Sequence, residues 1–79
     1  MATTKISLVN SAYTQVLSGA GFTYSEDKVM YFDSATQPAA TAEGMRVPKN
    51  QQFIGLAGKV IWAKSVDAAT ATVFSNPEA

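Results

Sequence analysis

The chain has 79 residues, no cysteine, no histidine and equal numbers of basic and acidic side chains, so its formal net charge is zero. Without cysteine the chain cannot form disulfides. Without histidine and cysteine, a zinc or copper site would have only carboxylate ligands, which these metals rarely accept alone. A net charge of zero gives no positive field that would attract nucleic acid or an anionic membrane. A chain of this length predicts a single domain, residues 1–79, with flexible ends at about 1–3 and 76–79.

Alternating apolar and polar residues predict strands from the start of the chain. Residues 4–9, TKISLV, place Ile6 and Leu8 on one side of an extended segment. Residues 11–18 alternate as well and are expected to form a strand. Ser11 can also cap a helix of about two turns, so a helical alternative stays open for this segment.

A hairpin is predicted from FTYS and KVMYFDS, with Glu26 and Asp27 at its tip. Residues 29–32 are apolar on both sides, and a strand of that kind has to be covered twice. In so small a domain, the second cover can be another copy of the same chain. The candidate interface residues are Tyr24, Tyr31 and Phe32, with burial in the core as the open alternative.

Residues 34–44 contain no apolar side chain larger than alanine and include Pro38, which predicts a loop. After an extended stretch and turn at 45–50, residues 59–65 and 70–75 alternate like a closing hairpin joined by SVDAA. The candidate core consists of large apolar side chains: Leu8, Phe53, Val60, Trp62 and Phe74. If three aromatic side chains instead lay exposed on one sheet face, they would offer a platform for a sugar.

Six or seven short antiparallel strands separated by polar turns are typical of an all-β sandwich or barrel, which is the expected fold class. Surface scaling gives a folded area of about 4,600 Å² against about 12,000 Å² for the unfolded chain, so roughly 60% is buried. That fraction is marginal for a monomer. Without cysteine or metal ligands, the remaining source of stability is association with other chains.

The side chains with reactive chemistry do not form a catalytic or metal motif. Glu26 and Asp27 are neighbours in a predicted turn, where both are readily solvated. Lys64 and Ser65 are adjacent in a predicted strand and therefore point to opposite faces. Asp27 and Asp33 lack the spacing of a calcium loop. We expect a protein that is not an enzyme and has no catalytic, metal or cofactor residue.

The stretches TKISLVNSAYTQVLSGAG, VMYFDSATQP, MRVPKNQQF and GKVIWAKSVDAATATVF together resemble small β-rich structural proteins of tailed bacteriophages. The resemblance implies a virion component: a capsid decoration or knob protein that forms a homotrimer on the head lattice, or a head-fibre or tail accessory piece. The implied partners are copies of itself, the major capsid protein or other virion proteins. No cofactor comes with the resemblance.

The start, MATTKISLVNS, lacks the basic and apolar run of a signal peptide, so we expect synthesis in the host cytoplasm and assembly into the virion. The alternative function is a carbohydrate- or host-surface-binding accessory domain of a tail or fibre. That alternative requires exposed aromatic side chains.

Overall fold

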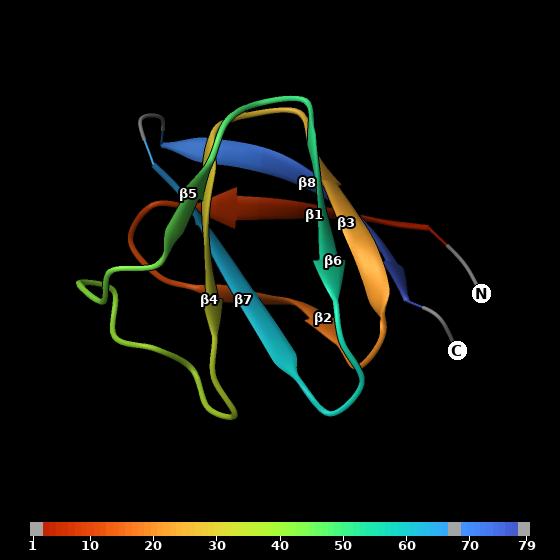
Figure 1. The fold of residues 1–79 in the computed structure, drawn as a ribbon. Coiled ribbons are helices and arrows are strands. Elements are labelled where there is room, and N and C mark those ends of the chain that lie inside the picture. The colour runs from red at the N-terminus through yellow and green to blue at the C-terminus, as the bar shows by residue number, and fades with distance from the viewer. Residues whose placement is uncertain (1–2, 67–68, 78–79) are drawn as a thin grey trace.

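The computed structural model describes residues 3–66 and 69–77, which form two four-stranded antiparallel sheets packed face to face (Figure 1). The first sheet has the strand order β1 (Thr4–Val9), β8 (Thr70–Pro77), β3 (Gly21–Ser25) and β6 (Gln51–Gly55). The second sheet has the order β2 (Thr14–Ser18), β7 (Val60–Ser65), β4 (Val29–Asp33) and β5 (Met45–Val47). The expected all-β class is confirmed, with eight strands in the described residues instead of six or seven.

The chain crosses from one sheet to the other at almost every connection, so both predicted hairpins are wrong. Strand β3 pairs with β6 and β8, whereas β4 pairs with β5 and β7. Strands β7 and β8 also lie in different sheets. Only β4 and β5 are both consecutive in the described chain and paired. A crossing between sheets has the same alternation and the same polar connection as a hairpin, so the two patterns look alike in a sequence.

The turn at residues 26–27 shows how one crossing is fixed. The backbone N–H of Glu26 donates to the carbonyl oxygen of Thr72 at 3.1 Å, and the N–H of Thr72 donates to Asp27 Oδ2 at 3.0 Å. These bonds continue the pairing of β3 with β8 beyond the last residue of β3. These hydrogen bonds therefore hold the turn against the first sheet, and the chain continues from the turn to β4 in the second sheet.

The core lies between the sheets and combines aliphatic side chains from both. Leu8 is fully buried and Ile6 packs against the cluster, so the side of β1 that these two residues share faces the core. Four small polar residues are buried with them: Thr23, Ser25, Ser65 and Ser75. The Ser75 hydroxyl donates a hydrogen bond to the carbonyl oxygen of Val16, which joins β8 to β2 across the sandwich.

Residues 14–18 form strand β2, so the helical alternative for this segment is wrong. The register against β7 shifts between Gln15 and Leu17, which marks a β-bulge. Val16 and Leu17 are both buried as a result, although strict alternation would send one of them outward. Gly55 packs here without a side chain, because a Cβ at that position would lie 2.3 Å from Leu17 Cδ2.

Strand β8 extends into the C-terminal end that was expected to be flexible, as far as Pro77. Asn76 and Pro77 belong to the strand and pair with Phe22 and Gly21 of β3. The Thr3 hydroxyl donates to Asn76 Oδ1, so residue 3 is also held in place. The rest of the expected flexible ends, residues 1–2 and 78–79, lies outside the described residues, as do residues 67–68 of the SVDAA connection.

The accessible surface of the chain is 4,475 Å². A typical monomer of 8.4 kDa exposes about 4,600 Å², so one copy folds as compactly as an average monomer of its mass. The fraction of surface buried stays at roughly 60%, which is marginal for stability.

Candidate functional site

The outer face of the second sheet is covered by the loop of residues 34–44. Four hydrogen bonds from side chains to backbone oxygens hold this loop: Trp62 Nε1 to Ser34 at 2.8 Å, Gln37 Nε2 to Tyr13 at 2.8 Å, Tyr13 Oη to Ala42 at 2.7 Å, and Lys64 Nζ to Ala40. Gly44 brings the backbone into close contact with β4, because a Cβ there would lie 2.3 Å from the carbonyl oxygen of Tyr31. Strand β4 is apolar on both sides, and the segment that covers its outer side therefore belongs to the same chain.

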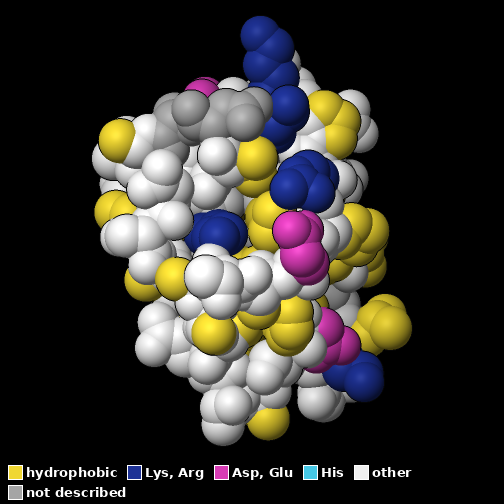
Figure 2. Space-filling view, turned by 90° about the vertical axis from the view of Figure 1, so that its left-hand side faces the viewer, with side chains coloured by type: hydrophobic (Ala, Val, Ile, Leu, Met, Phe, Trp, Pro, Cys, Tyr) yellow, Lys and Arg dark blue, Asp and Glu magenta, His cyan; other side chains and the backbone are white. Residues whose placement is uncertain are grey.

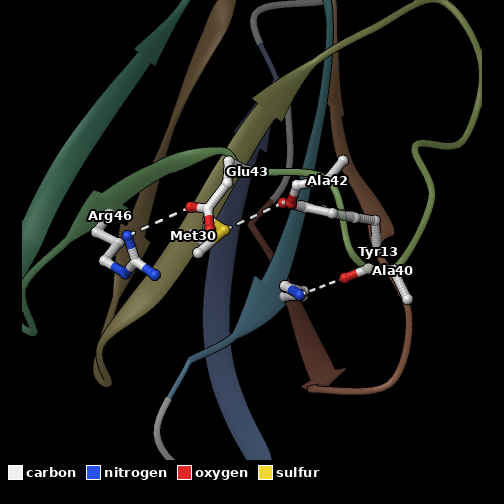
Figure 3. A network of polar contacts seen from close by, with 7 residues as sticks. Tyr13, Met30, Ala40, Ala42, Glu43 and Arg46 are labelled. Carbon is white, nitrogen blue, oxygen red and sulfur yellow. Dashed lines mark hydrogen bonds and ion pairs between the residues drawn. The ribbon is translucent and has the colours of Figure 1, made fainter.

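Tyr13 lies at the centre of this cover (Figure 3). Its hydroxyl oxygen is 3.1 Å from the sulfur of Met30, and its ring meets Phe32 edge-on with centroids 5.7 Å apart. The Lys64 ammonium is 5.3 Å from the centre of the ring. Burial raises the pKa of the Tyr13 hydroxyl above its ordinary value, and the nearby Glu43 carboxylate adds to the rise. The hydroxyl therefore acts as a neutral donor that fixes the loop.

Figure 2 views the molecule from the side on which this loop lies. Hydrophobic side chains form separate patches among polar side chains and backbone atoms, and basic and acidic groups are interspersed. The Arg46–Glu43 pair, 3.4 Å apart, is largely solvent-exposed, as is the Lys59–Asp33 pair at 3.9 Å. Exposed pairs of this kind contribute little to stability.

The outward side chains of the first sheet are exposed or half-buried. Three aromatic side chains lie together on its outer face: Phe22 and Tyr24 of β3 and Phe74 of β8, which we call the aromatic face. Tyr24 and Phe74 are cross-strand partners, and Phe22 is two residues from Tyr24 on the same side. Tyr24 is 38% exposed, and its hydroxyl donates to Asn50 Oδ1 at 3.1 Å.

The rim of the aromatic face combines an apolar side chain with two amide side chains. Ile54 of β6 pairs with Phe22 and is 61% exposed. Gln52 pairs with Tyr24, and Asn76 pairs with Phe22. Grouped exposed apolar side chains with a polar rim mark a binding surface more often than single ones do. The aromatic face is thus the candidate functional site of the described chain.

The three interface candidates separate in the structure. Tyr24 lies on the aromatic face and is exposed. Tyr31 points between the sheets and is only 2% exposed, so it belongs to the core and its assignment to an interface is wrong. Phe32 is half-buried on the outer face of the second sheet, where it contacts Tyr13 under the loop. Tyr13 of the same chain supplies to Phe32 the contact that another copy was expected to make.

Some of the core candidates lie on the inner face of their strand and others lie on the outer face. Leu8 is fully buried, and half-buried Phe53 stacks on Tyr31 with ring centroids 4.3 Å apart. Three other candidates are only half-buried and lie on outer faces, which corrects their assignment to the core: Val60, Trp62 and Phe74. In β7 the inward residues are Ile61, Ala63 and Ser65. The large Trp62 ring lies outward because its N–H can then bond to the loop at Ser34.

The side chains with reactive chemistry either make structural hydrogen bonds or lie apart from one another. Asp27 accepts a backbone hydrogen bond from β8. Lys64 lies half-buried against the loop while Ser65 is buried inside the sandwich, as their opposite directions predict. Among residues 3–66 and 69–77, no group of three acidic, histidine or cysteine side chains is placed to hold a metal ion. That part of the chain also has no helix long and apolar enough to cross a membrane.

No family model, curated protein or solved structure matches the chain. The geometry of the described residues therefore carries the functional argument. The sequence offers Phe22 as one of eight aromatic residues for an exposed platform, but it does not point to Ile54 of the candidate site. The available signal was that Phe22 and Tyr24 share a side of one strand, but the pairing of β3 with β6 and β8 is not readable from it.

Proposed function

We propose that this chain is a non-enzymatic structural protein of a bacteriophage virion, which docks on a protein lattice through the aromatic face. The observation that carries the proposal is the difference between the two outer faces. The chain covers the second sheet with its own loop, whereas the aromatic face stays accessible. The phage and capsid parts of the proposal, and assembly as a homotrimer, come from the sequence resemblance.

Docking through this face costs little conformational entropy, because the sheet already orders its side chains. Phe22, Tyr24 and Phe74 lie on two adjacent paired strands, so few rotamers are lost when a partner covers them. Aromatic side chains dominate the energetics of protein interfaces. A net charge of zero allows many copies to pack densely without strong repulsion.

The test is co-sedimentation of the purified chain with particles of the virus that encodes it. Tyr24→Ser is expected to reduce the affinity for particles about tenfold or more, since Tyr24 is the most exposed ring of the face. Met45→Ser is the matched control, because Met45 is 57% exposed on β5 in the other sheet. A wild-type chain that does not bind particles, or a Tyr24→Ser chain that binds equally well, would refute docking through this face.

A second candidate function uses the same surface to bind carbohydrate. The specific observation in its favour is the placement of the amide side chains Gln52 and Asn76 beside the rings of Tyr24 and Phe22. Aromatic rings stack on sugars, and amides can donate and accept hydrogen bonds with hydroxyl groups. Glycan-array binding by the isolated chain, lost in Tyr24→Ser and kept in Met45→Ser, would favour this function over docking on a protein lattice.

A further inference from the structure

Strand β6 forms one of the four open edges of the sandwich, together with β1, β2 and β5. An open edge carries backbone N–H and C=O groups that another strand can pair with, and most proteins protect such edges. Three of these edges have a protective feature. β1 carries Lys5, β2 has its bulge, and the three-residue β5 carries Arg46 and ends just before Pro48.

Strand β6 has none of these features. It pairs with β3 through five consecutive residues without a register shift. No charged residue and no proline occurs from Asn50 to Gly58. Two large apolar side chains are exposed in this segment, Ile54 at 61% and Leu56 at 64%. A regular, uncharged edge with exposed apolar side chains is the kind that takes up an additional strand.

We propose that β6 pairs antiparallel with β6 of a second copy, so that the two first sheets become one continuous eight-stranded sheet. A second copy fits because an uncharged edge meets itself without repulsion, and a two-fold contact requires only one self-complementary patch. A strongly charged partner strand would find no opposite charge in residues 50–58 with which to form an ion pair. The inference rests on the strand edge and not on the proposed function.

The register follows from the length of β6 and from its flanking charges. Phe53 is the middle residue of Gln51–Gly55, so a two-fold axis beside Phe53 pairs the whole strand. Gln52 of one copy then faces Ile54 of the other, on the outer side of the sheet. Centring on Ile54 would instead place Lys49 opposite Lys59 of the other copy, because these two lysines are equally distant from Ile54 in the sequence.

The contact is expected to be weak. A stable interface of standard size takes about 800 Å² from each partner, which is close to a fifth of the 4,475 Å² that this chain exposes. One five-residue strand and its neighbours cover less than that. The dimer is therefore expected to form and dissociate as the protein concentration is varied through the micromolar range.

Sedimentation velocity over a range of protein concentrations tests the proposal with the full chain. Ile54→Lys is expected to weaken dimerisation at least tenfold, because it places a charge on the paired edge. Met45→Lys, at a similarly exposed apolar residue of the other sheet, is expected to dimerise like the wild type. Circular dichroism melts of both variants confirm that each one folds.

Cysteine cross-linking tests the register, and the chain has no native cysteine to interfere. A mixture of Gln52→Cys and Ile54→Cys chains is expected to form a mixed disulfide faster than either chain alone, and Ser7→Cys on the opposite edge is the control. A wild type that is monomeric at all concentrations, or Ile54→Lys and Met45→Lys variants that associate equally, would overturn the proposal. Tyr24→Ser is expected to leave the dimer intact, which separates this contact from docking through the aromatic face.

Discussion

Replacing Tyr31 with phenylalanine should reveal how strongly one buried hydrogen bond joins the two sheets. The Tyr31 hydroxyl of β4 and the Thr23 hydroxyl of β3 are 2.8 Å apart, and neither residue is more than 2% exposed. Tyr31→Phe keeps the ring that stacks on Phe53 but leaves the Thr23 hydroxyl without this partner. Losing one partner of a buried pair costs about 1–3 kcal/mol. For a domain of this size, the melting temperature should fall by roughly 5–20 °C.

The assay is a double-mutant cycle in which urea unfolding is followed by circular dichroism. Thr23→Val alone should also destabilise the chain, since it leaves the Tyr31 hydroxyl buried without this bond. Removing both hydroxyls should recover much of the loss, because two apolar groups of the same shape can replace a buried pair at little cost. Single losses that simply add in the double variant, or a Tyr31→Phe chain as stable as the wild type, would show that the bond does not hold the sheets together.

Three further predictions concern the alkaline limit, the loop and the core. Burial raises the pKa of Tyr31 above its ordinary 10.0, so the stability gained from the neutral ring is present below about pH 10 and is lost as the pH rises through the folded-state pKa; urea titrations should show a smaller alkaline loss in Tyr31→Phe. Gly44→Ala should cost about 1–3 kcal/mol by pushing the loop off β4, and the emission of Trp62 should shift to the red, while Thr41→Ala leaves it unchanged. Ser25→Ala should move the alkaline transition of the same titration to higher pH, because a hydrogen bond with the buried Ser25 side chain lowers the pKa of Tyr31; an unchanged transition would contradict this.

Periodicity located most strands but did not say which face of each one is inward. In β7 the sequence alternates clearly, yet the small Ala63 and Ser65 are buried while Trp62 lies outward under the loop. The preference for burying the largest side chain pointed to the wrong face, because a tryptophan N–H needs a partner and Ser34 supplies one. The bulge in β2 defeats alternation in a similar way by turning two consecutive residues inward.

The candidate site was harder to predict than the fold class. Phe22, Tyr24 and Phe74 form one surface only because β3 pairs with β8, and strand pairing between distant segments leaves no local pattern. The small residues of the 34–44 segment predict only a loop that connects two strands. In the structure they let its backbone lie flat on the second sheet, as the contact at Gly44 shows.

The alternation of the chain between its two sheets has a consequence for biosynthesis. β8 lies between β1 and β3 in the first sheet, although a ribosome makes it after the other seven described strands. The nascent polypeptide therefore holds an unfinished first sheet, with β1 separated from β3 and β6, until that segment leaves the exit tunnel. Pairings so remote along the chain also predict slow folding, during which unpaired strand edges are prone to aggregate.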